Sequence, residues 1–330
     1  MSKLKLTLAC GEYDRTRPLI EGKVEPEGID LNYIALDPEE LFWRMAQNTE
    51  FDAAEFSMGA YFILISKGVD RFVGIPVFPS RMFRHSAIFI NTESGIEKPE
   101  DLKGKKIGVP DYTMTACFWI RGLLQHEYGV KPSDMKWFAG GLNNPGRQQR
   151  VKVALPDDVK MEHIGDKRTL NNMLVNGDLD VLIGARQPKA YDEGFSKVVR
   201  LWPEYIKTER DYFKKTKVFP IMHLIVIRRD IYEKNPWVAL SLYKAFDKAK
   251  EMCQSEIFDL SAPTYMVPGI EQLYEEVVEV MGEDYWPYGY EPNKKVLDTF
   301  AQYAYEQGMT EDLVDTKKIF APPTLNLYTI

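Results

Sequence analysis

The chain has 330 residues, a length that favours two domains over one. Hydrophobic residues make up 45% of the sequence and charged residues 28%, which is typical of a soluble globular protein. The formal net charge of −7 opposes binding to nucleic acid or to an anionic membrane, so an anionic ligand would have to be held by local positive charge.

The cysteines and the first residues bear on the cellular compartment. Cys10, Cys117 and Cys253 are too far apart in the sequence to indicate a disulfide framework or a zinc site. The first ten residues alternate apolar and polar side chains like a strand and lack the apolar core of a signal peptide. No apolar run approaches the length of a membrane span. The sequence therefore predicts a cytoplasmic protein.

Strands and helices alternate in the first part of the chain. A helix after the second strand has a clear start, because Asp37 can cap it, Pro38 occupies its first position and Glu40 the capping-box position. The alternation predicts an α/β sheet rich in parallel strands. The predicted strands are 3–9, 29–34, 51–56 and 72–77, and the predicted helices are 38–47 and 58–66.

The same alternation continues after Asn91. A helix over 169–176 should stop at Gly177, and a polar loop rich in Gly and Asn should fill 140–150. Thr113 or Thr115 lies near the start of another helix. The remaining expectations are a helical turn and a strand within 96–109, a helix over 113–127, strands near 137–139, 159–164, 181–184 and 198–201, and a helix from about residue 203.

The apolar segment 219–228 mirrors the segment 84–91, because both join basic residues to a run of strand-forming residues. We interpret the two segments as paired crossings between lobes. The rest is mostly helical, with helices over 236–255, 270–281 and 293–307, helix starts at Asn235-Pro236 and Thr310-Glu311, and an irregular tail around Pro322-Pro323.

Two α/β lobes joined by two crossings describe a periplasmic-binding-protein-like fold of the second type. The first lobe would be discontinuous, covering 1–91 and 218–330, and the second would cover 92–217. We expect the ligand in a cleft between the lobes, because open α/β sheets bind ligands at the carboxyl ends of their strands.

The segment 76–91, which includes the first crossing, contains an unusual group of side chains. Arg81, Arg84 and His85 fall within five positions, which is costly unless solvent or an anion satisfies them. The two interpretations are an anionic ligand site beside a titratable imidazole, and a solvated turn without a ligand.

Several segments together resemble a known family. They are Cys10-Gly11-Glu12-Tyr13-Asp14-Arg15-Thr16-Arg17-Pro18-Leu19, Ala54-Glu55-Phe56-Ser57, the run from Ile75 to Ser86, Gly108 to Ala116, and Phe219-Pro220-Ile221-Met222-His223. They resemble 4,5-dihydroxyphthalate decarboxylases over nearly the whole chain. The resemblance implies a cytoplasmic enzyme that converts 4,5-dihydroxyphthalate to protocatechuate and CO2 without oxidation. It also implies that no cofactor is needed, since the ring itself takes up the electrons.

That reaction needs groups that hold the carboxylates, and arginine suits the task because its planar fork binds carboxylate bidentately. For some of the candidate arginines, the alternative is an ordinary surface charge. Two threonines could add hydroxyl contacts at a helix start, or could act only as an N-cap. The candidates for substrate binding are Arg15, Arg17, Arg81, Arg84, Arg186, Thr113 and Thr115.

The reaction also needs a proton donor, and the ordinary pKa of histidine suits donation near neutral pH. His85 and His223 lie at the two crossings, so both are candidate acids, with packed hinge histidines as the alternative. His126 is expected to have a surface or packing role, and the role of His163 stays open. Glu55, at a buried strand end, could orient a histidine, take the phenol proton or form an ion pair with an arginine.

Other interpretations remain beside these. His85, His223 and Glu55 could bind a divalent metal, but their spacing does not favour a metal site. The aromatic segment 285–290 could cover the cleft or a subunit interface of a homo-oligomer, or simply pack on the core. The alternative functions are a solute-binding protein for a small aromatic or other carboxylate, and a ligand-sensing module. The sensing module would act through a further partner. The expected small-molecule partner is an aromatic carboxylate substrate, with no nucleic acid and no membrane.

Overall fold

The structure is a computed structural model that describes residues 2–147, 153–257 and 265–326. Contacts divide the chain into two compact units. Unit 1 consists of Met1–Arg81, Ile221–Asp298 and Asp315–Ile330, and unit 2 consists of Met82–Pro220 and Thr299–Val314. Within the described ranges, no helix is long and apolar enough to cross a membrane.

Unit 1 is built on a sheet with the strand order β2-β1-β3-β11-β4. β1 pairs in parallel with β2 and β3, whereas β11 runs antiparallel between β3 and β4. A strand from late in the chain therefore lies inside a sheet that is otherwise built from the first 81 residues. The strands are β1 (Leu4–Cys10), β2 (Ile29–Ala35), β3 (Ala53–Ser57), β4 (Phe72–Arg81) and β11 (Ile221–Arg228).

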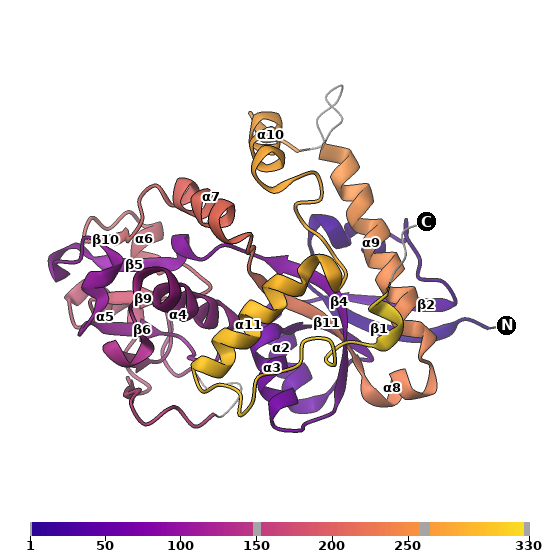
Figure 1. The fold of residues 1–330 in the computed structure, drawn as a ribbon, viewed down its shortest axis with the longest axis horizontal. Helices are drawn as coiled ribbons and strands as arrows, with labels where there is room; N and C mark the ends of the chain where they lie inside the picture. The colour runs from indigo at the N-terminus through magenta and orange to yellow at the C-terminus, as the bar shows by residue number, and fades with distance from the viewer. Residues whose placement is uncertain (1, 148–152, 258–264, 327–330) are drawn as a thin grey trace. The chain divides into compact units, whose positions relative to one another are not determined.

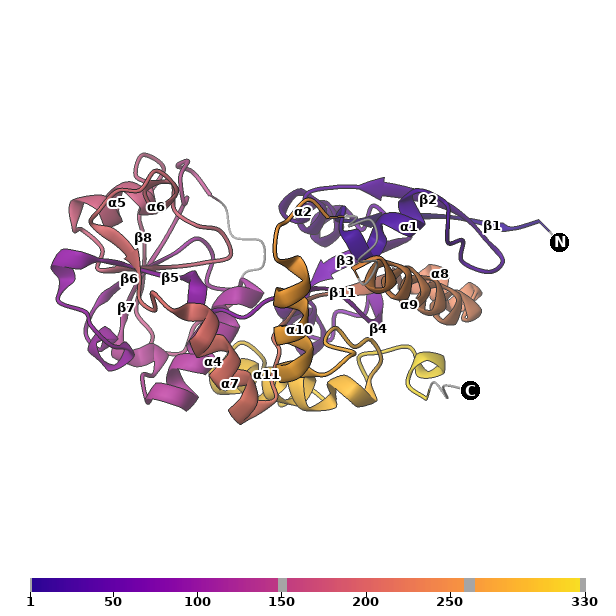
Figure 2. The ribbon, with the colours of Figure 1, turned by 90° about the horizontal axis from the view of Figure 1, so that it is seen from above.

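Helices cover this sheet, and α9 runs along it against α1, β4 and the 3-10 turn Asp14–Thr16 (Figures 1 and 2). α2 begins as predicted, since the Asp37 side chain accepts a hydrogen bond from the Glu39 N–H and Pro38 is its first residue. The helices are α1 (Arg17–Ile20), α2 (Pro38–Asn48), α3 (Met58–Ser66), α8 (Arg229–Lys234), α9 (Trp237–Ile257) and α10 (Ile270–Met281). The predicted bounds of α3 and α10 are confirmed, whereas the sequence patterns did not reveal α8.

Unit 2 contains a mixed sheet with the strand order β10-β5-β9-β6-β7-β8. β9, β6, β7 and β8 run parallel, and β5 joins β9 and β10 in antiparallel pairs. The helices α4 and α5 lie on opposite faces of this sheet (Figure 2). The strands are β5 (Ile88–Asn91), β6 (Lys106–Val109), β7 (Lys136–Ala139), β8 (Met161–His163), β9 (Val181–Ile183) and β10 (Val198–Arg200).

The helices of unit 2 are α4 (Thr115–Tyr128), α5 (Leu170–Asn176), α6 (Lys189–Asp192) and α7 (Tyr205–Thr216). α5 has both predicted ends, because Thr169 caps its start and Gly177 ends it in the left-handed conformation. α11 (Lys294–Glu306) begins in unit 1 and ends in unit 2. The buried face of α5 packs with Phe89 and Leu182 of the sheet, which forms the core of this unit.

Three expectations need correction. No helix begins at Thr310-Glu311, where the chain forms bends and turns. Thr113 does not cap α4, because the N-cap is Met114 and Thr113 instead bonds the Asp111 carboxylate. The unit boundaries also differ from the predicted lobes of 1–91 with 218–330 and of 92–217. Residues 82–91 belong to unit 2 because β5 pairs there with β9 and β10, and residues 299–314 belong to the same unit.

Candidate active site

The central pair of the site consists of Glu55 on β3 and His223 on β11. Ile225 lies opposite Glu55 in the antiparallel register, and side chains two residues apart on a strand share a face, so His223 is the diagonal neighbour of Glu55. His223 Nδ1 lies 2.6 Å from Glu55 Oε1. The register between β11 and β4 shifts on both sides of His223, an irregularity of the kind that redirects side chains near functional sites.

Glu55 is fully buried, and each of its oxygens receives hydrogen bonds. The Gly11 N–H donates to Oε2 at 2.8 Å, and the Tyr13 hydroxyl donates to Oε1 at 2.8 Å. Burial alone would raise the pKa of Glu55, but the hydrogen bonds from His223, Gly11 and Tyr13 and the charge of the imidazole outweigh burial and lower this pKa. Glu55 is therefore an ionised carboxylate at neutral pH, held in place for His223.

The two ring nitrogens of His223 differ in their surroundings, because Nδ1 is bonded to Glu55 and Nε2 is not. Its side chain is 18% exposed, and the Phe42 ring packs edge-on against the imidazole at 4.7 Å between centroids. Among the described residues, Nε2 of His223 has no hydrogen-bond partner. This nitrogen is therefore available to a ligand, with the ring orientation fixed by Glu55 and Phe42.

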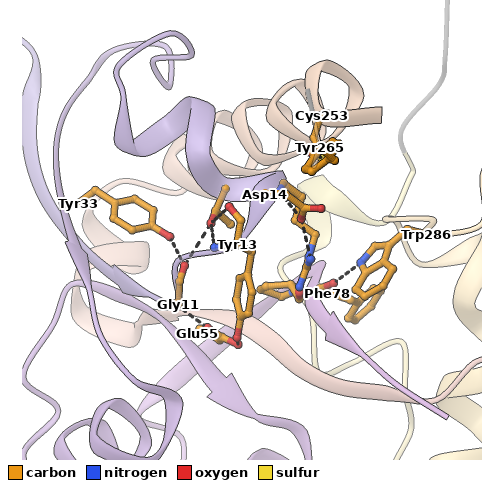
Figure 3. Close-up of polar contacts among 12 residues, drawn as sticks. Gly11, Tyr13, Asp14, Tyr33, Glu55, Phe78, Cys253, Tyr265 and Trp286 are labelled. Carbon is orange, nitrogen blue, oxygen red and sulfur yellow. Dashed lines mark hydrogen bonds and ion pairs between the residues drawn. The ribbon is translucent and has the colours of Figure 1, made fainter. Parts of the chain in front are cut away.

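Tyr13 fits beside Glu55 because Gly11 leaves room for its ring. A Cβ at Gly11 would lie 2.6 Å from the nearest Tyr13 ring atom, which is closer than real Cβ contacts come. The Gly11 carbonyl also accepts a hydrogen bond from the Tyr33 hydroxyl at 2.8 Å, and Figure 3 shows Tyr33, Gly11, Tyr13 and Glu55 side by side. Desolvation and the Glu55 charge raise the pKa of Tyr13, so its hydroxyl stays protonated and donates to Glu55.

Arg15 lies next to this cluster in a rigid setting. Its guanidinium lies between the rings of Tyr13 and Trp286, at 4.3 and 4.4 Å from their centroids. Nε donates to the Pro79 carbonyl at 2.6 Å and Nη1 donates to Asp14 at 2.9 Å, while Nη2 has no partner within the described ranges. Trp286 is itself fixed by a bond from its indole N–H to the Phe78 carbonyl (Figure 3). The site thus combines a proton-transfer group and a preorganised cation in unit 1.

His85, the other candidate acid, lies in unit 2 in a different environment. It is 2% exposed, and Trp202 and Tyr212 pack edge-on against its ring at 5.1 and 5.2 Å. Neither ring nitrogen has a hydrogen-bond partner in the part of the chain that the structure describes. Burial lowers the pKa of His85 to about 4, so the ring is neutral at neutral pH. This environment suits a packed histidine better than a general acid.

The predicted arginines have different surroundings. Arg81 is buried in unit 1, where Nη2 donates to the Pro287 carbonyl at 2.6 Å and to the Asn293 side chain, so it supports the loop before α11. Arg17 is exposed at the start of α1. Arg84 and Arg186 line one cavity of unit 2. A ligand role for each of these arginines stays a prediction.

The remaining candidates are two threonines and two histidines. Thr115 is the first residue of α4, and both Thr113 and Thr115 are buried. His126 bonds Glu306 at 2.6 Å and stacks on Tyr303, in line with a packing role, while His163 is exposed at the end of β8. Nowhere in the described ranges do three metal-ligating side chains gather as a metal site requires.

Sequence reasoning did not assign roles to Tyr13, Trp286 and Gly11. Tyr13 and Gly11 lie in the family-like segment 10–19, but their partners in space are far away along the chain, so no local spacing revealed them. Trp286 lies in the aromatic segment 285–290, where Tyr288 and Tyr290 are buried, as expected for a loop packed on the core. Cys10 lies 3.4 Å from Glu55, and burial raises its pKa, so it is a packed thiol.

Solved structures with a similar backbone establish the fold. The periplasmic aliphatic sulphonate-binding protein SsuA of Escherichia coli matches with a TM-score of 0.55 and 13% identity, covering 98% of this chain and 99% of that chain. A sulfonate-binding SsuA from Methylobacillus flagellatus matches with a TM-score of 0.56 and 14% identity, covering 98% and 93%. The predicted periplasmic-binding-protein-like α/β fold is thereby confirmed.

Relatives in sequence establish the family. The NMT1/THI5-like family model matches residues 27–155. A 4,5-dihydroxyphthalate decarboxylase of Pseudomonas putida is 40% identical over 214 residues, covering 65% of this chain and 83% of the relative. A 4,5-dihydroxyphthalate decarboxylase of Comamonas testosteroni is 37% identical over 330 residues, covering the full length of both chains. This chain therefore belongs to the 4,5-dihydroxyphthalate decarboxylase family.

Proposed function

We propose that this protein is a carboxy-lyase that converts 4,5-dihydroxyphthalate to protocatechuate and CO2 without oxidation. The observation that supports this most is the Glu55–His223 pair, in which a buried carboxylate fixes an imidazole whose outer nitrogen is open to a ligand. A protein that only binds a carboxylate needs cations and hydrogen-bond donors, but it has no need for an oriented acid. The two relatives described as 4,5-dihydroxyphthalate decarboxylases support the same substrate.

In the proposed mechanism, Nε2 of His223 delivers its proton to the ring carbon that bears the departing carboxylate. The hydroxyl para to that carbon pushes electron density toward it, which gives a dearomatised intermediate. The bond from the ring to the carboxylate then breaks, its electron pair returns to the ring, and CO2 leaves. The carbon keeps the new proton, and water restores the proton on His223. One proton is therefore consumed for each CO2 released.

Glu55 has the role of orienting His223 in this scheme. Its two oxygens accept hydrogen bonds from the Gly11 N–H, the Tyr13 hydroxyl and the His223 ring. The carboxylate is thus fixed on the Nδ1 side of the imidazole. In this position it stabilises the imidazolium that donates the proton, as a buried carboxylate does for a catalytic histidine elsewhere. The alternative in which Glu55 takes the phenol proton is less compatible with its complete burial.

Arg15 is the proposed carboxylate-binding group of unit 1. Its stacking between Tyr13 and Trp286 fixes the guanidinium plane before any ligand arrives, which reduces the entropy lost on binding. Because Tyr13 contacts both Arg15 and Glu55, one side chain links the cation to the proton-transfer pair. This arrangement would fix the distance between a bound carboxylate and the proton donor.

The test is incubation of the purified protein with a panel of hydroxylated phthalates and benzoates while CO2 and the aromatic product are measured. We expect CO2 and protocatechuate from 4,5-dihydroxyphthalate, and no CO2 from phthalate, which lacks the activating hydroxyls. Tight binding across the panel without CO2 would instead show the alternative function, a solute-binding protein for aromatic carboxylates. Absence of both CO2 and binding would reject both functions.

A further inference from the structure

Unit 2 contains a cavity that the proposed chemistry does not use. Its volume is about 430 Å³, which lies in the usual range for small-molecule sites. The polar part of its lining includes Arg84, Arg186 and Arg200, with Asp192 as the acidic residue of the lining. Cations therefore dominate this cavity in a protein whose overall net charge is −7.

Arg200 is held firmly at the wall of this cavity. Nε donates to the Ser86 carbonyl at 3.0 Å, Nη1 to the Tyr191 hydroxyl at 2.7 Å and Nη2 to Gln187 at 2.9 Å. The Tyr191 and Tyr205 rings each lie 4.6 Å from its guanidinium carbon. One hydrogen on each of the two terminal nitrogens remains beyond these bonds. Arg200 is therefore a fixed positive charge that also keeps Gln187 in place.

Arg84 and Arg186 add one buried cation and one exposed cation. Arg84 is 6% exposed, and burial lowers its pKa to about 10, with the Glu209 charge acting in the opposite direction. A bound anion in this cavity would give the guanidinium of Arg84 a charge-assisted hydrogen-bond acceptor. Arg186 is exposed in the segment that follows β9, so the cavity has a cation at an accessible position.

The place in the sheet and the apolar lining fit an aromatic ligand. Gly184, Ala185 and Arg186 directly follow the carboxyl end of β9, and this edge of an α/β sheet is the usual place for ligands. Phe89 and Met82 give the cavity apolar surface beside the arginines. Two kinds of surface in one cavity suit a ligand with a flat apolar ring and anionic substituents.

We infer that this cavity of unit 2 binds an aromatic ligand with two adjacent carboxylates, and that Arg84, Arg186 and Arg200 recognise the pair. The inference rests on the proposed function only for its ligand class, since 4,5-dihydroxyphthalate has two adjacent carboxylates and protocatechuate has one. The cavity would accordingly prefer the dianionic substrate over the singly charged product.

Calorimetric titration of the full chain with phthalate and with benzoate tests the inference without any turnover. Phthalate has the two adjacent carboxylates but lacks the hydroxyls that the reaction needs. We expect phthalate to bind at least about tenfold more tightly than benzoate. Arg186→Met should weaken phthalate binding about tenfold and benzoate binding much less, because an exposed arginine is removed without disturbing the core.

Two further variants complete the design. Arg84→Lys keeps the buried charge and the fold while removing the planar fork, and we expect it to weaken phthalate binding by a similar factor. Arg168→Met is the matched control, because Arg168 is an exposed arginine of unit 2 outside the cavity lining. We expect it to bind phthalate like the wild type.

The inference is overturned if Arg186→Met and Arg84→Lys both bind phthalate like the wild type, or if sulfate binds as tightly as phthalate. Its failure is distinct from failure of the proposed function. Phthalate binding with these mutational effects but without CO2 from 4,5-dihydroxyphthalate would keep the inference and reject the enzyme. CO2 release from 4,5-dihydroxyphthalate with unchanged phthalate binding in both variants would keep the proposed enzyme and reject the inference about the cavity.

Discussion

The Nδ1 atom of His223 lies 2.6 Å from Oε1 of Glu55, although the two residues are 168 positions apart in the sequence. The carboxylate is fully buried and the imidazole is 18% exposed, so the pair has an inner acceptor and an outer group that a ligand can reach. This asymmetry gives the two residues separate roles, and each role can be tested by a substitution of nearly the same size.

Replacement of His223 by Asn should abolish most turnover while leaving ligand binding nearly intact. Asparagine keeps part of the hydrogen bonding but has no titratable proton, and loss of general acid catalysis costs about 10²–10⁴ in rate. The measurement is kcat for CO2 release together with the Kd of phthalate. The parallel variant His85→Asn should keep most of the rate, because His85 is a neutral, packed histidine. Equal losses in both variants would contradict the assignment of the donor to His223.

Replacement of Glu55 by Gln should lower kcat by a similar order, about 10²–10⁴, with little change in KM. Glutamine preserves the shape of the side chain, but its amide no longer supplies the negative charge that favours the protonated imidazole. Tyr13→Phe is the milder comparison, since it removes one hydrogen bond to Glu55 and keeps the ring that stacks on Arg15. We expect a loss of about tenfold or less for Tyr13→Phe. Steady-state kinetics over a range of pH separates the two effects.

Replacement of Arg15 by Met should weaken dicarboxylate binding by about 2–4 kcal/mol, the scale for losing a charged partner in a desolvated pair. Trp286→Leu keeps the charge but removes one side of the stack, so we expect a smaller increase in Kd. Arg44 of α2 pairs with Glu40 and Glu50 at the surface, which makes Arg44→Met a suitable control for the loss of one positive charge in unit 1. Unchanged affinity in Arg15→Met would remove this arginine from the site.

Acid should destabilise the protein through His85. Its pKa is about 4 in the folded state against an ordinary value of 6.5, so between these values the unfolded chain binds a proton that the folded chain does not. Stability is therefore fully present above pH 6.5 and falls as the pH drops toward 4, by about 3 kcal/mol for this residue. His85→Phe should remove this part of the pH dependence. Urea unfolding at pH 7.5 and pH 4.5 measures it, with the exposed His163→Gln as control.

Replacement of Gly11 by Ala should disturb the site by displacing the Tyr13 ring. The new Cβ would lie 2.6 Å from the Tyr13 ring, so the ring must shift away from both Glu55 and Arg15. We expect Gly11→Ala to cost about 1–3 kcal/mol in unfolding free energy, the usual scale for overpacking. Turnover should fall more than this loss of stability explains at temperatures where the variant is folded. A variant with wild-type kcat would show that the position of Tyr13 is unimportant.

The sequence was a good guide wherever the signal is local. Asp37 and Pro38 predicted the start of α2, Thr169 and Gly177 predicted both ends of α5, and the strand around Glu55 was visible as an apolar run. The contacts of Tyr13, Arg15 and Trp286 could not be predicted, because they depend on strand register and loop packing between distant segments. The lobe boundary near residue 91 was misplaced because β5 has the composition of a strand but gives no sign of its pairing partners.

The position of β11 also has a consequence for how the chain is made. Glu55 and its neighbours leave the ribosome early, yet the imidazole that completes the pair follows only after the 139 residues of Met82–Pro220. Domains usually form as the chain emerges. The sheet of unit 1 cannot be completed at that stage, because β11, which lies between β3 and β4, is synthesised later. A chain released before residue 221 would expose the facing edges of these two strands, which are prone to pair with other chains. Formation of the bond between His223 and Glu55 therefore marks the point at which the first sheet has closed.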